Sequence, residues 1–312
     1  MMSNKFRIAV RKFGPFESAT EKIWTSFCEE TGCDLELEAI PMDLHPLHEA
    51  TLGKENGLIN GDWDVTHINT DWITEANEKN ALEDLVPWIE KNNPQGFPEG
   101  WSDSLLGMQK FDDRILGLPF HDGPECLIYR KDLFENSDEK TAFKKQYNRE
   151  LTPPTTWDEL LEVAHFFQRP KKNLYGTVVA AFPDGHNTVF DLCLQIWTRG
   201  GDIVNKNGNV NIATQEAIDG LAFYRKLLKS DRAIHPKSSE MDSVKSGMAF
   251  ANGEIALMVN WFGFASMCEV YSESKVKGCV DIVDVPAGQG GKGASLNVYW
   301  LYGIAKGSQH KK

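Results

Sequence analysis

The sequence predicts an α/β fold. Strand-like and helix-like segments alternate along most of the chain, a pattern typical of mostly parallel sheets covered by helices. The 312 residues suggest two domains or one large one. Hydrophobic residues make up 41% of the chain and charged residues 25%, as in ordinary globular proteins. Because open sheets of this kind bind ligands where their strands end, we expect the functional residues in the loops after strands.

The first elements are an apolar strand at residues 7–10 and a helix at residues 18–32. Ser18 and Glu21 have the spacing of a capping box, which predicts that the helix begins there. Gly32 is a typical helix end. An apolar stripe should bury one face of this helix through Ile23, Trp24, Phe27 and Cys28.

Apolar runs and alternating patterns predict the next strands at residues 34–40, 64–69, 115–120 and 126–130. A helix at residues 71–79 follows the second of these strands, with Asp71 as its candidate N-cap. The charged stretch at residues 135–154 ends in two prolines and is the most linker-like part of the chain.

The second half continues the alternation. Helices are expected at residues 156–167, 188–201 and 214–230, and strands at residues 175–182, 255–259, 280–286 and 298–305. Thr156 and Glu159 form a second capping box. The helix at 188–201 is apolar nearly all round, so we expect it to be largely buried.

The net charge of −12 and the pI of about 5.2 argue against nucleic acid or an anionic membrane surface as the main partner. No apolar run reaches the roughly 20 residues that cross a bilayer. The chain opens with MMSNKFRIAV and shows no secretory signal. We therefore expect either the mature region of an exported protein or a protein that stays in the cytoplasm.

The six cysteines form no CxxC pair and no zinc-finger spacing with histidine, so we expect no metal site. Cys126 and Cys193 lie in apolar segments and are expected in the core. Two pairings, Cys28 with Cys33 and Cys268 with Cys279, remain open in an oxidising compartment.

Residues 288–293, GQGGKG, match the G-x-G-x-x-G pattern of dinucleotide sites. The residues after them do not open a helix, and a pyrophosphate needs a helix N-terminus. We therefore expect a flexible loop here and no cofactor.

The segment FANGEIALMVNWFGFAS, residues 250–266, ends an apolar strand with an amide and three large rings. An aromatic face covers the apolar C–H face of a sugar ring, and neighbouring amides and carboxylates bind its hydroxyls. Asn260 and Trp261 have this combination. INTDW repeats it with Asn69, Asp71 and Trp72, and PFHDGPE adds His121, Asp122 and Glu125 after another strand.

An ordered series of segments resembles the carbohydrate-binding family of extracellular solute-binding proteins of ABC importers, which includes maltose-binding protein. The segments are GDWDVTHINTDWITEANEKNALEDLVPWI, ILGLPFHDGPECLIYRKDLFE, PPTTWDELLEVAHFF, GGDIVN with TQEAIDGLAFYRKLL, FANGEIALMVNW, and DIVDVPAGQGG with VYWLYGIAKGSQ. Together they span almost the whole chain.

The resemblance implies a two-lobed periplasmic-binding-protein-like fold of type II, with a ligand cleft between the lobes and a hinge. Lobe one would comprise residues 1–117 and 262–306, and lobe two residues 118–261. Phe262 and Phe264 would then pack into lobe one. The family's usual C-terminal helices of lobe two would be missing after residue 312.

It also implies a monomeric, non-catalytic binding protein that delivers a mono- or oligosaccharide to a membrane permease. Its place would be the periplasm or, as a lipoprotein, the cell surface. The residues expected to contact the ligand are Phe13, Asn69, Asp71, Trp72, His121, Asp122, Glu125, Asn260, Trp261, Tyr299 and Trp300. For Tyr299 and Trp300, core packing is an equally good interpretation.

Two alternatives stay open. The first is a sugar-active enzyme such as a glycosidase, with paired carboxylates as acid and base or nucleophile. The second keeps the fold but changes the ligand to a cationic solute such as a polyamine, because several carboxylates follow the predicted strands.

Overall fold

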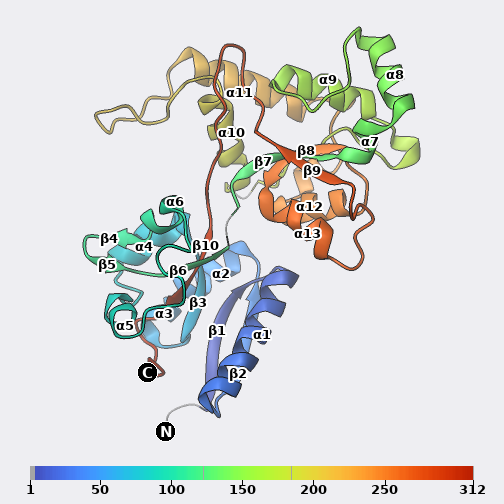
Figure 1. Cartoon of the computed structure of the whole chain (residues 1–312). Helices are drawn as coiled ribbons and strands as arrows, with labels where there is room; N and C mark the ends of the chain where they lie inside the picture. Colours follow the sequence, from blue (N-terminus) through green and yellow to red (C-terminus); the bar gives the residue numbers. More distant parts are fainter. Residues whose placement is uncertain (1–3, 122, 184, 312) are drawn as a thin grey trace. The chain divides into compact units, whose positions relative to one another are not determined.

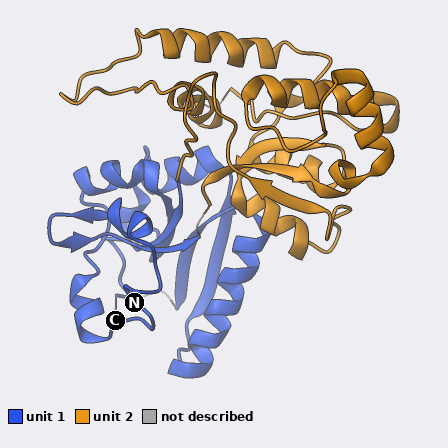
Figure 2. Ribbon diagram, turned by 45° about the horizontal axis from the view of Figure 1, so that its top comes forward, with its two compact units in different colours: residues 1–122, 298–312 blue, residues 123–297 orange. Residues whose placement is uncertain are grey.

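The computed structural model describes residues 4–121, 123–183 and 185–311. The chain forms two compact units, coloured separately in Figure 2. Unit 1 comprises Met1–Asp122 and Val298–Lys312, and unit 2 comprises Gly123–Asn297. These units differ from the expected lobes mainly at residues 262–297, which belong to unit 2 because their helix and strand pack with its sheet.

Unit 1 is built on a five-stranded sheet of order β2-β1-β3-β10-β6 (Figure 1). Strand β1 is parallel to β2 and β3, whereas β10 is antiparallel to both β3 and β6. The elements of unit 1 are β1 (Lys5–Arg11), α1 (Gly14–Thr31), β2 (Glu36–Met42), α2 (Leu44–Thr51), α3 (Gly57–Asn60), β3 (Val65–Asn69), the 3-10 helix η1 (Thr70–Trp72), α4 (Ile73–Glu78), α5 (Val86–Lys91), α6 (Asp103–Gly107), β4 (Lys110–Phe111), β5 (Arg114–Ile115), β6 (Leu118–His121) and β10 (Trp300–Ile304).

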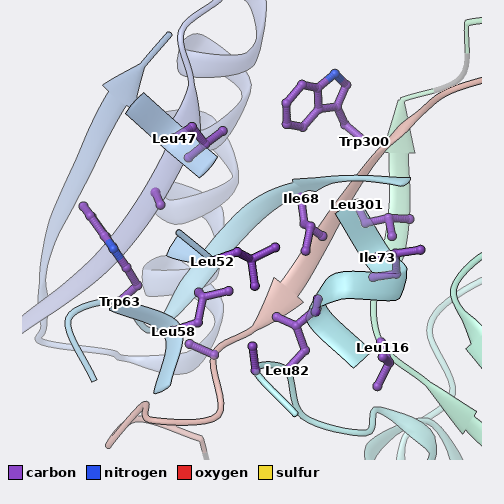
Figure 3. Packing of buried hydrophobic residues seen from close by; sticks show 14 of the residues in the cluster. Leu47, Leu52, Leu58, Trp63, Ile68, Ile73, Leu82, Leu116, Trp300 and Leu301 are labelled. Carbon is purple, nitrogen blue, oxygen red and sulfur yellow. The ribbon is translucent and has the colours of Figure 1, made fainter. Parts of the chain in front are cut away.

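The core of unit 1 joins segments from both ends of the chain (Figure 3). Leu301 of β10 lies directly opposite Ile68 of β3, and both side chains are at most 1% exposed. Leu47, Leu58 and Leu82 complete this region from the surrounding helices and loops. Burial of each such side chain is worth about 1.5–3 kcal/mol, so apolar packing as well as the strand ladder holds β10 in place.

Helix α1 differs from its prediction at the N-terminus. It begins at Gly14, after the N-cap Phe13, and no side chain caps it. The capping box predicted for Ser18 and Glu21 was wrong, because a proline in the first turn already has the backbone angle that starts a helix. The helix end at Gly32 is confirmed by its left-handed backbone, with φ 69°.

The predicted apolar stripe of α1 is not its buried face. The buried residues of the helix are Phe16 and Thr20, whereas Ile23 and Phe27 are 56% and 44% exposed. Trp24 stacks on Phe6 with ring centroids 4.9 Å apart. The first turns of α1 therefore provide its contact with the core.

Unit 2 contains a three-stranded sheet of order β8-β7-β9, antiparallel in both pairs. The expectation of mostly parallel sheets was therefore wrong for this unit. Its elements are β7 (Glu125–Arg130), α7 (Lys131–Glu135), α8 (Ser137–Tyr147), α9 (Trp157–Phe167), the 3-10 helix η2 (Pro170–Lys172), α10 (Asn187–Trp197), α11 (Gln215–Leu228), the 3-10 helix η3 (Ser238–Glu240), α12 (Ser243–Ala251), β8 (Leu257–Trp261), α13 (Phe262–Val270) and β9 (Val280–Val283).

Two segments of unit 2 depart from the sequence prediction. The strand expected at 175–182 makes only isolated parallel bridges, at Tyr175 and Thr177. The linker-like stretch at 135–154 contains helix α8, whose fully buried Phe143 lies edge-on against Phe166 of α9 at 5.1 Å. Phe143 thus anchors a charged helix on the unit, together with the ion pair of Glu139 with Arg169. The capping box of α9 at Thr156 and Glu159 is confirmed.

All six cysteines are free thiols, so neither of the two open pairings forms in this structure. Cys126 is buried, as expected, whereas Cys193 is half-buried. Among the described residues, no helix has the length and apolarity needed to cross a bilayer.

The glycine-rich segment at 288–293 lies against the end of α10. The Gly288 amide donates to the Thr198 carbonyl at 2.8 Å. A Cβ at Gly291 would lie 1.9 Å from the same carbonyl oxygen, whereas one at Gly293 would meet nothing within 4 Å. The expectation of a flexible loop was therefore wrong at Gly288 and Gly291, where the absence of a side chain permits close backbone packing.

These two glycines give a matched test of this packing. We expect Gly291→Ala to lower the free energy of unfolding by about 1–3 kcal/mol, because backbone must shift to admit the methyl group. Gly293→Ala should stay within about 0.5 kcal/mol of the parent. Urea unfolding of the three proteins measures both values, and equal stability of the two variants would contradict the close packing.

Candidate functional site

In unit 1 the predicted site residues gather where β3 and β6 end and β10 begins. Because β10 is antiparallel to both neighbours, its first residue, Trp300, lies opposite Asn69 and opposite His121. Three predicted residues from distant parts of the sequence therefore share one edge of the sheet. Trp300 itself is 9% exposed and lies at the margin of the core cluster in Figure 3.

Asn69 holds the turn that follows β3. It is 2% exposed, and its Oδ1 accepts a hydrogen bond from the Asp71 amide at 3.3 Å. Asn69 is thus the N-cap of η1, and the prediction that Asp71 caps the next helix was wrong. This turn leaves Asp71 exposed and Trp72 half-buried.

Tyr299 is fully buried, and its hydroxyl donates to Gln109 Oε1 at 2.8 Å. Its backbone amide donates to Thr70 Oγ1 at 3.2 Å, and the Thr70 amide donates to the Tyr299 carbonyl at 3.1 Å. These bonds attach the start of β10 to η1. The burial favours core packing over ligand contact for Tyr299.

Phe16, which the sequence interpretation missed, lies at the centre of an aromatic cluster. Its ring meets Phe13, Phe120 and His121 with centroids 5.1, 5.1 and 5.3 Å apart. The Trp300 ring centroid lies 6.3 Å from that of Phe16. Trp300 also meets Trp72 in a T-shaped contact, with centroids 5.7 Å apart. The rings of Phe13, Trp72 and Trp300 are therefore supported by mutual packing.

His67 of β3 underlies this cluster and is 1% exposed. Its Nδ1 accepts a hydrogen bond from the Arg11 amide at 3.3 Å, which requires the proton on Nε2. Burial lowers the pKa of His67 from 6.5 to about 3 because the charged ring would lose its hydration. The imidazole is consequently neutral at ordinary pH and acts as packing.

This lowered pKa predicts a pH dependence of stability. Between pH 6.5 and about 3 the unfolded chain binds a proton at His67 that the folded protein does not, so stability falls as pH falls. The loss should approach about 1.4 kcal/mol per pH unit. His67→Gln should remove this contribution, whereas the exposed-histidine variant His45→Gln should retain it. Urea unfolding between pH 7 and 5 measures the slopes, and identical slopes for all three proteins would contradict the assignment.

In unit 2, β8 ends at Trp261, whose backbone lies opposite Glu125 at the start of β7. The half-buried Trp261 ring meets Phe190 of α10 in a T-shaped contact at 5.7 Å. The ring of His186, which precedes α10, also contacts Phe190, with centroids 4.5 Å apart. Trp261 is therefore held from the side while part of its surface stays exposed.

Asn260 positions Trp261. It is 3% exposed, and its Nδ2 donates to the Ser243 carbonyl at 3.2 Å and to Ser246 Oγ at 3.1 Å. Its Oδ1 accepts a hydrogen bond from the Trp261 amide at 2.8 Å. The amide is thus engaged by α12 and by the adjacent backbone.

Helix α13 starts directly after Trp261 and explains the remaining rings of this segment. Phe264 is 6% exposed, and its ring occupies the space beside Gly247 of α12. Phe262 is 38% exposed. Both belong to unit 2, whereas we expected them to pack into lobe one. The reason is that α13 folds back onto β7, β8 and β9.

Glu125 is 5% exposed, and its Oε2 has no hydrogen-bond partner within the described part of the chain. Ser295 Oγ donates to its carbonyl at 2.6 Å, and its amide donates to the Leu296 carbonyl at 3.0 Å, so its backbone is firmly held. Burial, with a contribution from the nearby Asp191, raises the pKa of Glu125 well above its usual range. Asp122, another predicted site residue, lies outside the described residues.

Asp191 of α10 was missed as a site residue. The Tyr224 hydroxyl donates to its Oδ2 at 2.9 Å, and burial raises the pKa of Asp191 from 3.8 to about 7. The available signal was a single acid within the apolar run FDLCLQIW. Among the described residues no group of three metal-binding side chains occurs.

Two α/β units with supported aromatic rings and polar groups at their strand ends define the two-lobed fold of a periplasmic binding protein. The chain belongs to the family described as bacterial extracellular solute-binding proteins, which it matches over residues 16–312.

Known relatives agree on this fold. A maltose-bound MalE3 of T. maritima is 25% identical, with a TM-score of 0.81 over 98% of this chain and 73% of its own. A ribitol complex of an ABC transporter solute-binding protein from Agrobacterium radiobacter is 23% identical, with a TM-score of 0.82 over 98% and 72%. A putative binding protein of Brucella abortus is 22% identical over 80% of this chain and 54% of its own length. The chain thus spans about half the length of such curated relatives.

Proposed function

We propose that this protein is a non-enzymatic receptor that binds a sugar or polyol and delivers it to the permease of an ABC importer. The observation that carries the proposal is Trp261, whose half-buried ring packs on Phe190, whose backbone amide donates to Asn260, and whose backbone lies opposite Glu125. A fixed aromatic face beside a carboxyl group suits a ligand that has both C–H faces and hydroxyls.

Unit 1 adds groups of the same chemistry. The ring of Phe13 and those of Trp72 and Trp300 are supported by neighbouring aromatic side chains, and Asp71 is exposed beside them. We propose that these side chains of unit 1 also contact the solute, through aromatic faces and a carboxylate.

We propose fewer ligand-contacting residues than the sequence predicted. Phe13, Asp71, Trp72, His121, Glu125, Trp261 and Trp300 remain proposed ligand contacts, and Asp122 stays a prediction. Asn69 and Asn260 are proposed as positioning residues because the protein itself engages their amides. Tyr299 is proposed as a core residue.

Relatives support the class of ligand and the transport role. The Thermotoga relative at 25% identity was solved with maltose. A curated relative from Deinococcus radiodurans is named a probable ABC transporter-binding protein. The family is described as extracellular, so we propose that this protein works outside the cytoplasmic membrane, as a monomer.

Variants of Trp261 and Asn260 distinguish a role in ligand binding from a role in folding. We expect Trp261→Ala to weaken sugar binding by about 2 kcal/mol, roughly 30-fold, because the stacking face is lost, and to change stability by less than about 1 kcal/mol. Trp261→Phe should retain part of the affinity.

Asn260→Ala should lower stability by about 2–4 kcal/mol because it leaves buried partners unsatisfied. Calorimetry and urea unfolding measure these effects. If Trp261→Ala unfolds the chain while its folded fraction binds normally, the ring is only a core residue.

The function itself is tested with a panel of mono- and oligosaccharides and polyols. We expect at least one to raise the unfolding temperature and change tryptophan fluorescence, with no product released on prolonged incubation. Chromogenic glycosides, with Glu125→Gln as control, test the glycosidase alternative. A folded protein that responds to no member of the panel would contradict the proposal, as would sustained product release lost in the variant.

A further inference from the structure

Unit 2 contains a carboxyl pair without a basic partner. Glu125 begins β7, and Asp191 lies on α10, where Tyr224 of α11 donates to its Oδ2. The groups that act on the charge of Glu125 are Asp191 and burial, and those that act on Asp191 are burial and Tyr224. No lysine, arginine or histidine contributes to either among the described residues.

The other titratable neighbours are also acidic or neutral. Cys126 adjoins Glu125 on β7 and Cys193 lies on α10, and burial, followed by the charge of Glu125, raises the pKa of both thiols. Burial and the charge of Asp191, with a smaller contribution from Glu125, raise the pKa of the Tyr224 hydroxyl. Each of these three neighbours can donate a hydrogen bond, and none of them can neutralise a second negative charge.

Two neighbouring carboxylates without a cation are costly here, because Glu125 is buried and Asp191 is half-buried, so both lose hydration. The pair can respond by retaining a proton or by receiving a cation from outside. The pKa of Asp191, raised to about 7, indicates that a proton is retained near neutral pH when no cation is present.

One acceptor atom of the pair, on Glu125, lacks a hydrogen-bond partner among the described residues. Glu125 Oε2 is buried and makes no hydrogen bond within the described residues, although the backbone of Glu125 is held by Ser295 and Leu296. The Trp261 backbone lies opposite Glu125, and the Trp261 ring contacts Phe190, the residue before Asp191. A solute that stacks on Trp261 therefore lies near Glu125, the carboxyl group whose pKa Asp191 raises.

We propose that the Glu125–Asp191 pair binds a protonated amine of the solute, so that the substrate class is amino sugars or amino polyols. This inference rests on the proposed function, since it assigns a substrate class to the same site. The ammonium group supplies the missing cation, donates to Glu125 Oε2, and gains from the neighbouring Trp261 ring as well.

In the free protein near pH 7 the pair holds at least one proton, because the pKa of each carboxyl group is raised, and the amine arrives as R–NH₃⁺. On binding, the pair becomes fully ionised around the ammonium, and each displaced proton goes to solvent. At least part of one proton is thus released per bound solute near neutral pH, whereas a neutral sugar would leave the pair protonated.

The test compares matched ligands by calorimetry at pH 7 in two buffers of different ionisation enthalpy. Each hexose, such as glucose, galactose or mannose, is paired with its 2-amino and N-acetylamino derivatives. We expect one amine to bind at least about tenfold tighter than its hexose and its acetylated form, because a charge-assisted bond replaces a neutral one. The heat of this binding should differ between the two buffers, because the buffer takes up the protons that the pair releases.

Variants of the pair identify the residues responsible. Glu125→Gln and Asp191→Asn should each reduce the amine preference to within about threefold and abolish proton release. Asp281→Asn, which removes an exposed acid from β9, should leave both unchanged. Circular dichroism checks folding, and because the two pair variants are independent, one folded variant suffices.

The outcomes distinguish the two proposals. A hexose that binds as tightly as its amine without proton release overturns the inference and leaves the proposed sugar receptor standing. An amine preference that survives in both pair variants also overturns it. Failure of every sugar, polyol and amine to bind the folded parent protein overturns the proposed function and the inference together.

Discussion

Unit 1 is complete only when residues 298–312 return to it and β10 enters between β3 and β6. Nearly the whole of unit 2 separates β6 from β10 in sequence, so this pairing closes a very long loop. The burial of Leu301 against Ile68 offsets that cost. The same insertion brings Trp300 opposite Asn69 and His121, so the site edge of unit 1 exists only after the chain has closed.

At the ends of β3 and β8, buried amides hold the backbone, and side chains that come after them keep exposed surface. Asn69 and Asn260 are buried, and their side-chain amides form hydrogen bonds that hold the turns after β3 and β8. The residues that follow them, Asp71 and Trp261, keep exposed surface. Rigid support of this kind lowers the entropy lost on binding, because the rings are ordered before the ligand arrives.

In unit 2 the charges of two acidic residues, Glu125 and Asp191, are likewise not arranged for stability alone. Asp191 of the apolar helix α10 raises the pKa of the buried Glu125, and loss of hydration opposes full charge on both groups. Such an arrangement is unfavourable for stability alone, because apolar residues would fill the space at lower cost. Groups whose pKa values are strongly shifted concentrate at functional sites, which agrees with the place of this pair beside Trp261.

Local sequence patterns determined the elements with strong short-range signals. The capping box of Thr156 and Glu159, the helix end at Gly32 and the strands around Ile68 and Leu301 follow from hydrogen bonds and periodicity within a few residues. Tertiary structure alone decided which face of α1 is buried, the antiparallel sheet of unit 2, and the roles of Phe16 and Asp191. These depend on contacts between residues far apart in the chain, whose free energy no local pattern contains.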